Sequence, residues 1–555
     1  MRALPAFAAA LAALAAAAPA AAAPALFGWF DYRGGDPSDR LPAGPGDYRN
    51  PVLHGFYPDP SVVRAGRDFY LVTSTFAWFP GIPVWKSRDL VHWRQIGNAI
   101  DRPGQLDFKR LGLSRGVFAP SIHYRAGTFY IVNTCVDCGG NFIVTAKDPA
   151  GPWSGPVWLP ELEGGIDPAL FFDDDGSAWL INNGPPPGQP LYEGHRAIWL
   201  QRIDIKTLKP FGPRTMLVNG GVDISRKPVW IEGPHILKKD GWYYLTCAEG
   251  GTAEGHSQVV FRSRRPDGGF VPFGGNPILT QRDLPRNRPM PITSAGHAQL
   301  VDTPDGRWWA TFLATRPYEG DFYNTGRETF LLPVTWSDGW PRITRPGETI
   351  AYVHRAPALA AGAAPATAGA FRSFENFRGP ALPFHWMQMR NPTSRWWHLS
   401  GSGLRIDGRP VRLGDNGNPS LLARRQQHMN AEAATELRTC PGEGEEAGLA
   451  ALQNDDYWYL LALARSGGAT KLVLKRRAGP GDPAAGKVMA EAPFRCRDAV
   501  RLRIEAKGPV YRFSYAAKGG EWRRLGGEQD GTLLSTKTAG GFVGAVFGLY
   551  AYAPR

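Results

Sequence analysis

The chain has 555 residues, more than one ordinary hydrophobic core accommodates, so we expect at least two domains. Glycine (67) and proline (50) are abundant, aromatic residues make up 12%, and amphipathic helical runs are scarce, which together indicate an all-β protein with many tight turns. The net charge of +13 is scattered rather than gathered into basic runs beside stacking aromatics, which argues against a nucleic-acid partner.

Residues 1–23 contain one basic residue, a long run of alanine and leucine, and small residues at the end. This pattern is typical of a secretory signal peptide, with a membrane anchor as the alternative. The run is weakly apolar, so we favour cleavage. No later segment is apolar enough to span a bilayer, so we expect a soluble protein, secreted or periplasmic, without a membrane partner. The sequence leaves the oligomeric state open, a homo-oligomer included.

A short pattern recurs five times in the first 350 residues. It has a polar or small lead residue, an apolar strand, a glycine turn and an aromatic strand, and its lead positions are Asp59, Ala119, Asp167, Glu232 and Gly296. Each copy indicates a β-hairpin, and the period of about 45 to 65 residues is that of a propeller blade. We therefore predict a five-bladed β-propeller at residues 24–355, with unrelated hairpins of a sandwich as the alternative.

The innermost strands of a propeller line its central channel, so lead residues at the start of those strands would face the axis. Three of them are carboxylates: Asp59, Asp167 and Glu232. Buried charges are costly unless they are paired or used, so acids in these places indicate a function. Inverting hydrolysis of a glycosidic bond needs a general acid and a general base, and a third carboxylate can raise the pKa of the acid.

The five cysteines indicate disulfides rather than a metal site. Cys135 and Cys138 form a C-V-D-C motif, but the second ligand pair that zinc would need is absent. In an exported protein a local disulfide is the better interpretation. Cys440 and Cys496 could pair with each other, which would leave Cys247 buried and reduced, although the sequence does not fix this connectivity.

The composition of the chain changes after residue 355. Residues 356–370, APALAAGAAPATAGA, form a linker of small residues. Alternating strands then continue to the end of the chain, for example YWYLLA from residue 457 and VRLRI from residue 500. Residues 371–555 are therefore predicted to form a β-sandwich of the size of a lectin-like module.

Seven stretches match motifs of one known family in order and spacing. They are NPVLHGFYPDPS (50–61), FAWFPGIPVWKSRDLVHWRQIG (76–97), GVFAPSIHY (116–124), GIDPALFFDDDG (165–176), EGPHILKKDGWYYLTCAEGGT (232–252), GHAQLVDTPDGRWW (296–309) and GRETFLLPVTW (326–336). Together they resemble glycoside hydrolase family 43. The C-terminal part, with GGFVGAVFGLYA at 540–551, resembles the β-sandwich appended to the xylosidase-type branch of that family.

The resemblance implies a five-bladed propeller, inversion of the anomeric configuration, and β-xylosidase, α-L-arabinofuranosidase or endo-acting arabinan or xylan hydrolase activity. Asp59 matches the general base, Glu232 the general acid, and Asp167 the residue that tunes the pKa of the acid and orients it. Arg327 matches the arginine that contacts the sugar in the subsite of the cleaved residue.

Further residues are assigned to the pocket with less support. His297 matches an axial histidine that in some members lies near a bound calcium ion or water, and a satisfied core histidine is the alternative; no cofactor is required. Phe542 matches an aromatic residue that the sandwich inserts toward the pocket, and Phe118 stands in the pocket wall where many members carry tryptophan. Trp78 and Phe79 could stack on the sugar, or else pack between blades.

A sandwich that blocks one side of the pocket favours removal of one terminal sugar. We therefore expect an inverting, exo-acting hydrolase that releases xylose or arabinose from xylan or arabinoxylan fragments, with xylo- or arabino-oligosaccharides as substrates. The alternatives are α-L-arabinofuranosidase as the main activity, or a non-catalytic carbohydrate-binding propeller, although such proteins usually lack one of the three acids. A retaining fructan-cleaving enzyme is disfavoured because the signatures of that group are absent.

Overall fold

A computed structural model of the chain describes residues 24–360, 367–496 and 499–554. The expected signal peptide at 1–23 and residues 361–366 of the expected linker lie outside these ranges. Strands and turns make up nearly all of the described chain, which confirms the all-β class. In the same ranges, no helix is long and apolar enough to cross a membrane.

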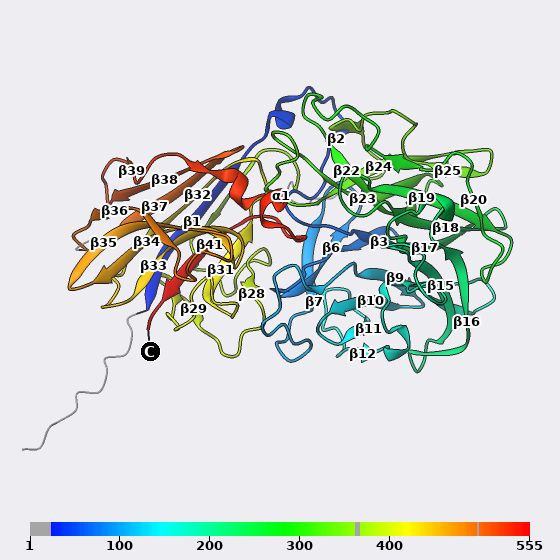
Figure 1. Cartoon of the computed structure of the whole chain (residues 1–555), viewed down its shortest axis with the longest axis horizontal. Helices are drawn as coiled ribbons and strands as arrows, with labels where there is room; N and C mark the ends of the chain where they lie inside the picture. Colours follow the sequence, from blue (N-terminus) through cyan, green and yellow to red (C-terminus); the bar gives the residue numbers. More distant parts are fainter. Residues whose placement is uncertain (1–23, 361–366, 497–498, 555) are drawn as a thin grey trace, which may run out of the picture.

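Five antiparallel blades follow one another along the chain (Figure 1). The first two contain β3 (Ser61–Ala65), β4 (Asp68–Val72), β6 (Gly81–Ser87) and β7 (Arg94–Ile100), then β8 (Gly116–Val117), β9 (Ser121–Arg125), β10 (Thr128–Val136), β11 (Gly140–Ala146) and β12 (Val157–Trp158). The third and fourth contain β13 (Ile166–Phe172), β14 (Ala178–Gly184), β15 (Ala197–Asp204) and β16 (Lys209–Asn219), then β17 (Glu232–Lys239), β18 (Trp242–Glu249), β19 (Ser257–Ser263), β20 (Val271–Pro272) and β21 (Leu279–Thr280). The fifth contains β22 (Thr293–Asp302), β23 (Trp308–Thr315), β24 (Glu328–Ser337) and β25 (Trp340–Arg342). The five predicted repeats are therefore five blades.

The first strands β3, β9, β13, β17 and β22 surround the propeller axis. Each lies against the first strand of the next blade, and β22 lies against β3, so the ring is closed. The chain ahead of β3 fastens this closure, because the backbone N–H of Val52 donates to the carbonyl of Thr329 in β24 at 2.9 Å. In addition, β2 (Asp47–Arg49) pairs with β26 (Val353–Arg355). The start of the propeller is thereby bonded to its last blade.

The other domain is a sandwich of two antiparallel sheets around one core. The first sheet contains β1 (Ala25–Gly34), β27 (Phe371–Glu375), β29 (Trp397–Ser400), β30 (Gly403–Ile406), β32 (Asn430–Leu437), β37 (Val500–Lys507), β38 (Val510–Ala517), β39 (Arg523–Arg524) and β40 (Gln529–Asp530). The second contains β31 (Ser420–Arg425), β33 (Glu446–Asn454), β34 (Tyr457–Ser466), β35 (Ala469–Ala478), β36 (Lys487–Pro493) and β41 (Val546–Tyr552). The described helical segments are η1 (Pro37–Arg40), η2 (Pro160–Leu162), η3 (Ile224–Arg226), η4 (Gly531–Leu534) and α1 (Thr536–Ala539).

The structure corrects the predicted start of the propeller at residue 24. β1 lies between β30 and β32 in the sandwich, and the chain crosses to the propeller only afterwards (blue in Figure 1). The side chains of Phe27, Phe30 and Tyr32 in β1 belong to the sandwich core. The sequence could not reveal this, because the alternation within a strand does not depend on which distant strands it pairs with.

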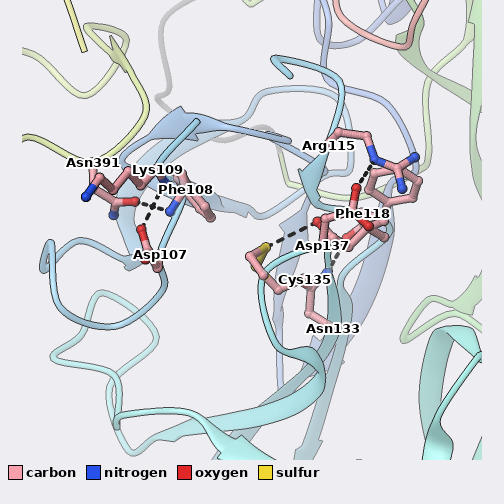
Figure 2. The surroundings of a disulfide bond; sticks show 11 residues. Asp107, Phe108, Lys109, Arg115, Phe118, Asn133, Cys135, Asp137 and Asn391 are labelled. Carbon is pink, nitrogen blue, oxygen red and sulfur yellow. Dashed lines mark hydrogen bonds and ion pairs between the residues drawn. A yellow bond between two sulfur atoms is a disulfide. The ribbon is translucent and has the colours of Figure 1, made fainter. Parts of the chain in front are cut away.

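Both predicted disulfides are present. Cys135 and Cys138 are bonded in the turn between β10 and β11 (Figure 2), and Cys440 is bonded to Cys496 in the sandwich. Cys247 is buried and unpaired, as expected.

A buried ion cluster joins the two domains. Arg316 is fully buried, and its guanidinium pairs with Asp36, just after β1, and with Glu328 at the start of β24, each at 2.6 Å. Glu328 also accepts a hydrogen bond from the backbone N–H of Gly55 at 2.8 Å. The cluster therefore ties the crossing segment, the last blade and the loop that leads to Asp59.

We expect Arg316→Met to lower the free energy of unfolding by about 3–5 kcal/mol, because two buried carboxylates would lose their shared cation. Arg64→Met is the control, since Arg64 pairs with Asp302 at the surface and its loss should cost less than about 1 kcal/mol. Urea unfolding of the two variants measures both values. Equal values for the two variants would contradict the role given to the buried cluster.

Candidate active site

A cavity of about 370 Å³ lies at the propeller axis. It brings together seven of the nine predicted site residues: Asp59, Phe118, Asp167, Glu232, His297, Arg327 and Phe542. They come from all five blades and from the sandwich. The cavity is therefore complete only when the ring is closed and the two domains are in contact.

Trp78 and Phe79 do not line this cavity, which corrects the prediction that they stack on the sugar. They form β5, which pairs with β28 (Gln388–Met389) of the C-terminal part, and both side chains are buried at that junction. Phe76 lines the cavity instead. Its backbone is left-handed (φ 54°) and bridges to β8, so the chain changes direction between Phe76 and β5.

The carboxylates enter the pocket from irregular backbone at the start of the inner strands. Asp59, Asp167 and Gly233 each come directly before a proline and have φ of 55°, 52° and 57°. Glu232 therefore lies one position earlier than the two aspartates, which corrects the predicted equivalence of the three. β13 and β17 share the same β-bulge, between Ile166 and Ala169 and between Glu232 and His235, so Gly233 occupies the place of Asp167 and Glu232 that of Ile166.

Gly233 connects the acid to the rest of the site. Its backbone N–H donates to Oδ2 of Asp167 at 3.1 Å. A Cβ atom here would lie 2.8 Å from Nε2 of His297, so the close approach of the imidazole ring, together with the positive φ, requires glycine. His297 itself belongs to the site, because its Nδ1 lies 3.9 Å from Oδ1 of Asp59.

Asp59 is buried and yet ionised. Arg327 donates from Nη1 to its Oδ1 at 3.2 Å, and the hydroxyl of Ser74 donates to its Oδ2 at 2.5 Å. Burial alone would raise the pKa of Asp59, but Arg327, His297 and Ser74 outweigh it and hold the pKa below its ordinary value. The carboxylate is therefore available as a base at neutral and acidic pH.

The other two carboxyl groups hold their protons more tightly. Burial raises the pKa of Asp167 to about 6, and the charge of Asp59 contributes to the rise. Burial also raises the pKa of Glu232 well above its ordinary value, and repulsion from Asp167 and Asp59 raises it further. A protonated carboxyl next to an ionised one is the pair that general acid–base catalysis of hydrolysis requires.

Known families match both domains. Residues 48–341 match Glycosyl hydrolases family 43, and residues 375–555 match the Beta xylosidase C-terminal Concanavalin A-like domain. The chain belongs to glycosyl hydrolase family 43. It is therefore a glycoside hydrolase, and the resemblance seen in the sequence motifs is confirmed. The concanavalin A-like match also agrees with the lectin-like sandwich predicted from the sequence.

Several family 43 proteins are similar over nearly their whole length. The chain is 38% identical to a xylosidase/arabinosidase of Butyrivibrio fibrisolvens, covering 90% of this chain and 95% of that protein. It is 35% identical to a non-reducing end alpha-L-arabinofuranosidase of Bacteroides ovatus, covering 91% of each. A crystal structure of a family 43, subfamily 12 protein from a capybara gut metagenome has a TM-score of 0.89 and 39% identity, covering 95% of this chain and 99% of that one.

Three phenylalanines form one wall of the pocket in this family 43 enzyme. The ring centroids of Phe76, Phe118 and Phe542 lie 5.6, 5.7 and 6.0 Å from one another. The guanidinium of Arg327 lies 5.2 Å from the ring of Phe542, so the aromatic wall also packs against this arginine. Since Phe542 comes from the sandwich, that domain completes the pocket.

Phe542 reaches the pocket because the backbone next to it, at Gly544, lies directly against the propeller backbone at Gly326. A Cβ atom on Gly544 would lie 2.8 Å from the backbone nitrogen of Gly326, so this crossing leaves room only for glycine. The backbone N–H of Phe542 donates to the hydroxyl of Ser114 at 2.8 Å. The sandwich segment is therefore held by the propeller on both sides of the phenylalanine.

Among the further residues that line the pocket, four have aromatic or polar side chains and were missed in the sequence: Phe76, Arg115, Trp230 and Thr252. Thr252 helps to hold Arg327 in place, since its hydroxyl accepts from Nη1 of Arg327 at 2.8 Å. A signal existed for three of the four, because Phe76 opens a family motif, Thr252 ends another, and Trp230 comes two residues before the expected acid. Nothing in the sequence distinguished Arg115 from other polar loop residues.

The calcium ion that the resemblance allows near His297 stays a prediction. Among the residues that the structure describes, no three His, Cys, Asp or Glu side chains are grouped so as to hold a metal ion. Such an ion would have to rely on backbone carbonyls and water, which calcium accepts as ligands.

We expect Asp167→Asn to move the alkaline limb of the pH profile to lower pH by roughly one unit or more. Activity needs ionised Asp59 and protonated Glu232, so it is lost as pH rises through the raised pKa of Glu232. Removing the neighbouring charge lowers that pKa. The dependence of kcat/KM on pH measures the shift, with Asp173→Asn, at a hairpin tip of the same blade, as the control. An unmoved limb would show that Asp167 does not tune the acid.

Proposed function

We propose that this enzyme is an inverting, exo-acting glycoside hydrolase that releases single xylose or arabinose residues from the ends of xylan or arabinoxylan fragments. The observation that carries the proposal is the opposite charge state of two carboxyl groups in one pocket. The environment of Asp59 lowers its pKa, and the environment of Glu232 raises its pKa. A binding protein would have no use for such a pair.

In the proposed reaction Glu232 donates its proton to the glycosidic oxygen as the bond to the anomeric carbon breaks. Asp59 removes a proton from a water molecule, and the oxygen of that water bonds to the anomeric carbon from the opposite face. The configuration at that carbon is therefore inverted. Asp167 keeps the pKa of Glu232 high, and Arg327 holds Asp59 in its ionised form while contacting the sugar.

Exo action is supported by the shape of the pocket. Phe542 closes it from the sandwich side, and the cavity of about 370 Å³ is at the small end of the range for ligand pockets. A sugar in the middle of a polysaccharide would need two exits, whereas a terminal sugar needs one. The names of relatives, a xylosidase/arabinosidase and a non-reducing end alpha-L-arabinofuranosidase, support the same two sugars.

The proposal includes export of the protein to the periplasm or the medium. The Cys135–Cys138 and Cys440–Cys496 disulfides support it, because disulfides persist outside the reducing cytoplasm. Polysaccharide fragments of plant walls are found in the same compartments. The cleavage of residues 1–23 and the oligomeric state remain predictions.

We expect Asp59→Ala and Glu232→Ala each to lower kcat on xylo-oligosaccharides by roughly a hundredfold or more, the usual contribution of a general acid or base. For Glu232→Ala the loss should be much smaller on a dinitrophenyl glycoside, whose leaving group needs no proton. Assays of aryl β-xyloside and aryl α-L-arabinofuranoside in parallel give the preferred sugar. Full activity of either variant on natural oligosaccharides would refute the assignment, and binding without any product would favour a carbohydrate-binding protein.

We expect the first product anomer to have the configuration opposite to that of the substrate, because water attacks directly rather than through a glycosyl-enzyme intermediate. Proton NMR during the first minutes of hydrolysis, before mutarotation, distinguishes the two anomers. Xylose of the α configuration should come first from a β-xyloside. Retention of configuration would instead indicate a double displacement and a nucleophilic carboxylate.

A further inference from the structure

We propose that Arg115 is a specificity-determining residue, which binds the sugar on the leaving side of the cleaved bond, and that a disulfide-closed turn holds it there. The inference rests on the proposed function and goes beyond it, because neither the acid–base pair nor the contacts around the cleaved sugar use Arg115. The turn is the C-V-D-C motif at 135–138, to which the hydrolysis itself gives no role.

Exposure divides the pocket into a deep end and a mouth. The side chains of Asp59 and Arg327 are 7% and 8% exposed, whereas that of Arg115 is 44% exposed, and all three line the same cavity. A terminal sugar that reaches Asp59 therefore fills the deep end. The remainder of the substrate has to pass the mouth, where Arg115 lies.

The strand next to Arg115 is fixed along both of its edges. One edge of β8 pairs with the first half of the C-V-D-C turn, at the end of β10 (Figure 2). The other edge bonds to Phe76, whose backbone N–H and carbonyl both take part. Arg115 directly precedes this strand, so its backbone position follows from the turn on one side and the aromatic wall on the other.

The side chain of Arg115 is oriented by the same turn. Its Nε donates to Oδ2 of Asp137 at 2.6 Å, a bond that Figure 2 draws as a dashed line. Asp137 lies between the two cysteines with φ of 62°, a left-handed turn conformation that aspartate tolerates better than most other residues. The bond between Cys135 and Cys138 closes the turn around Asp137, so the disulfide keeps the carboxylate aimed at the arginine.

Most of the hydrogen-bonding capacity of Arg115 is left for a ligand. A guanidinium has five N–H donors in one plane. In the described part of the chain, the bond from Nε to Asp137 is the only hydrogen bond that Arg115 side-chain donors make. Donors with a fixed direction at the mouth suit the ring and exocyclic oxygens of a second sugar, and they discriminate against leaving groups that lack such acceptors.

The test compares a substrate that has a leaving sugar with one that has none. Xylobiose places its second sugar at the mouth, whereas the leaving group of β-D-xylosyl fluoride is one atom. We expect Arg115→Ala to lower kcat/KM for xylobiose roughly tenfold more than for the fluoride, the worth of one hydrogen bond from a charged group. Arg115→Lys should recover part of the loss, because it keeps the charge without the planar donors.

Arg102→Ala is the matched control. Arg102 forms a similar half-exposed ion pair with Asp101 on the propeller but does not line the pocket, so the ratio of the two substrates should stay as in the unaltered enzyme. Equal losses on both substrates in Arg115→Ala, or no loss on either, would overturn the inference. Failure of the unaltered enzyme to hydrolyse both substrates and their arabinosyl counterparts would contradict the proposed function instead.

A second set of variants tests the positioning role of the turn. Asp137→Asn, and separately Cys135→Ser combined with Cys138→Ser, should each reproduce part of the selective loss on xylobiose. Added to Arg115→Ala, they should cause no further selective loss, because the arginine that they hold is gone. Cys440→Ser with Cys496→Ser is the control for the loss of a disulfide as such. Full additivity with Arg115→Ala would overturn the role of the turn.

Discussion

Burial of three carboxyl groups in one pocket, with repulsion between their charges, is the constraint on which this active site depends. Asp59, Asp167 and Glu232 share one pocket with Arg327, which bonds to Asp59. A negative charge is therefore stabilised on Asp59 and costly on Glu232, so the glutamic acid keeps its proton. Two chemically similar side chains thus become a base and an acid through their surroundings alone.

A stiff frame has to hold these charges at close range. The inner strands form a closed ring, Glu232 lines the pocket, and the backbone N–H of Gly233 next to it donates to Asp167. Glu328, the residue after Arg327, is fixed in the second buried charge cluster by Arg316. The buried cluster around Arg316 therefore helps to position Arg327, the arginine that pairs with Asp59 in the pocket.

The sandwich is part of the active site as well as a neighbour of it. Its segment at 540–546 crosses the propeller where two glycines let the backbones meet, and it supplies the ring of Phe542. β1 belongs to the sandwich although it precedes the propeller in sequence, so the chain passes between the domains twice. Different parts of the chain build the deep end and the mouth of the pocket. The carboxylates come from the start of the inner strands, and Arg115 comes from a loop that bonds to Asp137 in the disulfide-closed turn.

The sequence by itself determined the five hairpins, the sandwich after residue 370 and the identity of the three carboxylates, because strand alternation, glycine turns and short motifs are local patterns. Only the tertiary structure decided that β1 joins the sandwich, that Trp78 turns to the domain junction while Phe76 enters the pocket, and that Arg115 meets Asp137. These outcomes depend on pairing between distant segments and on single backbone angles, which leave no pattern in the local sequence. The charge states of the three carboxyl groups also depend on the tertiary structure, because a pKa is set by burial and by neighbours that only folding brings together.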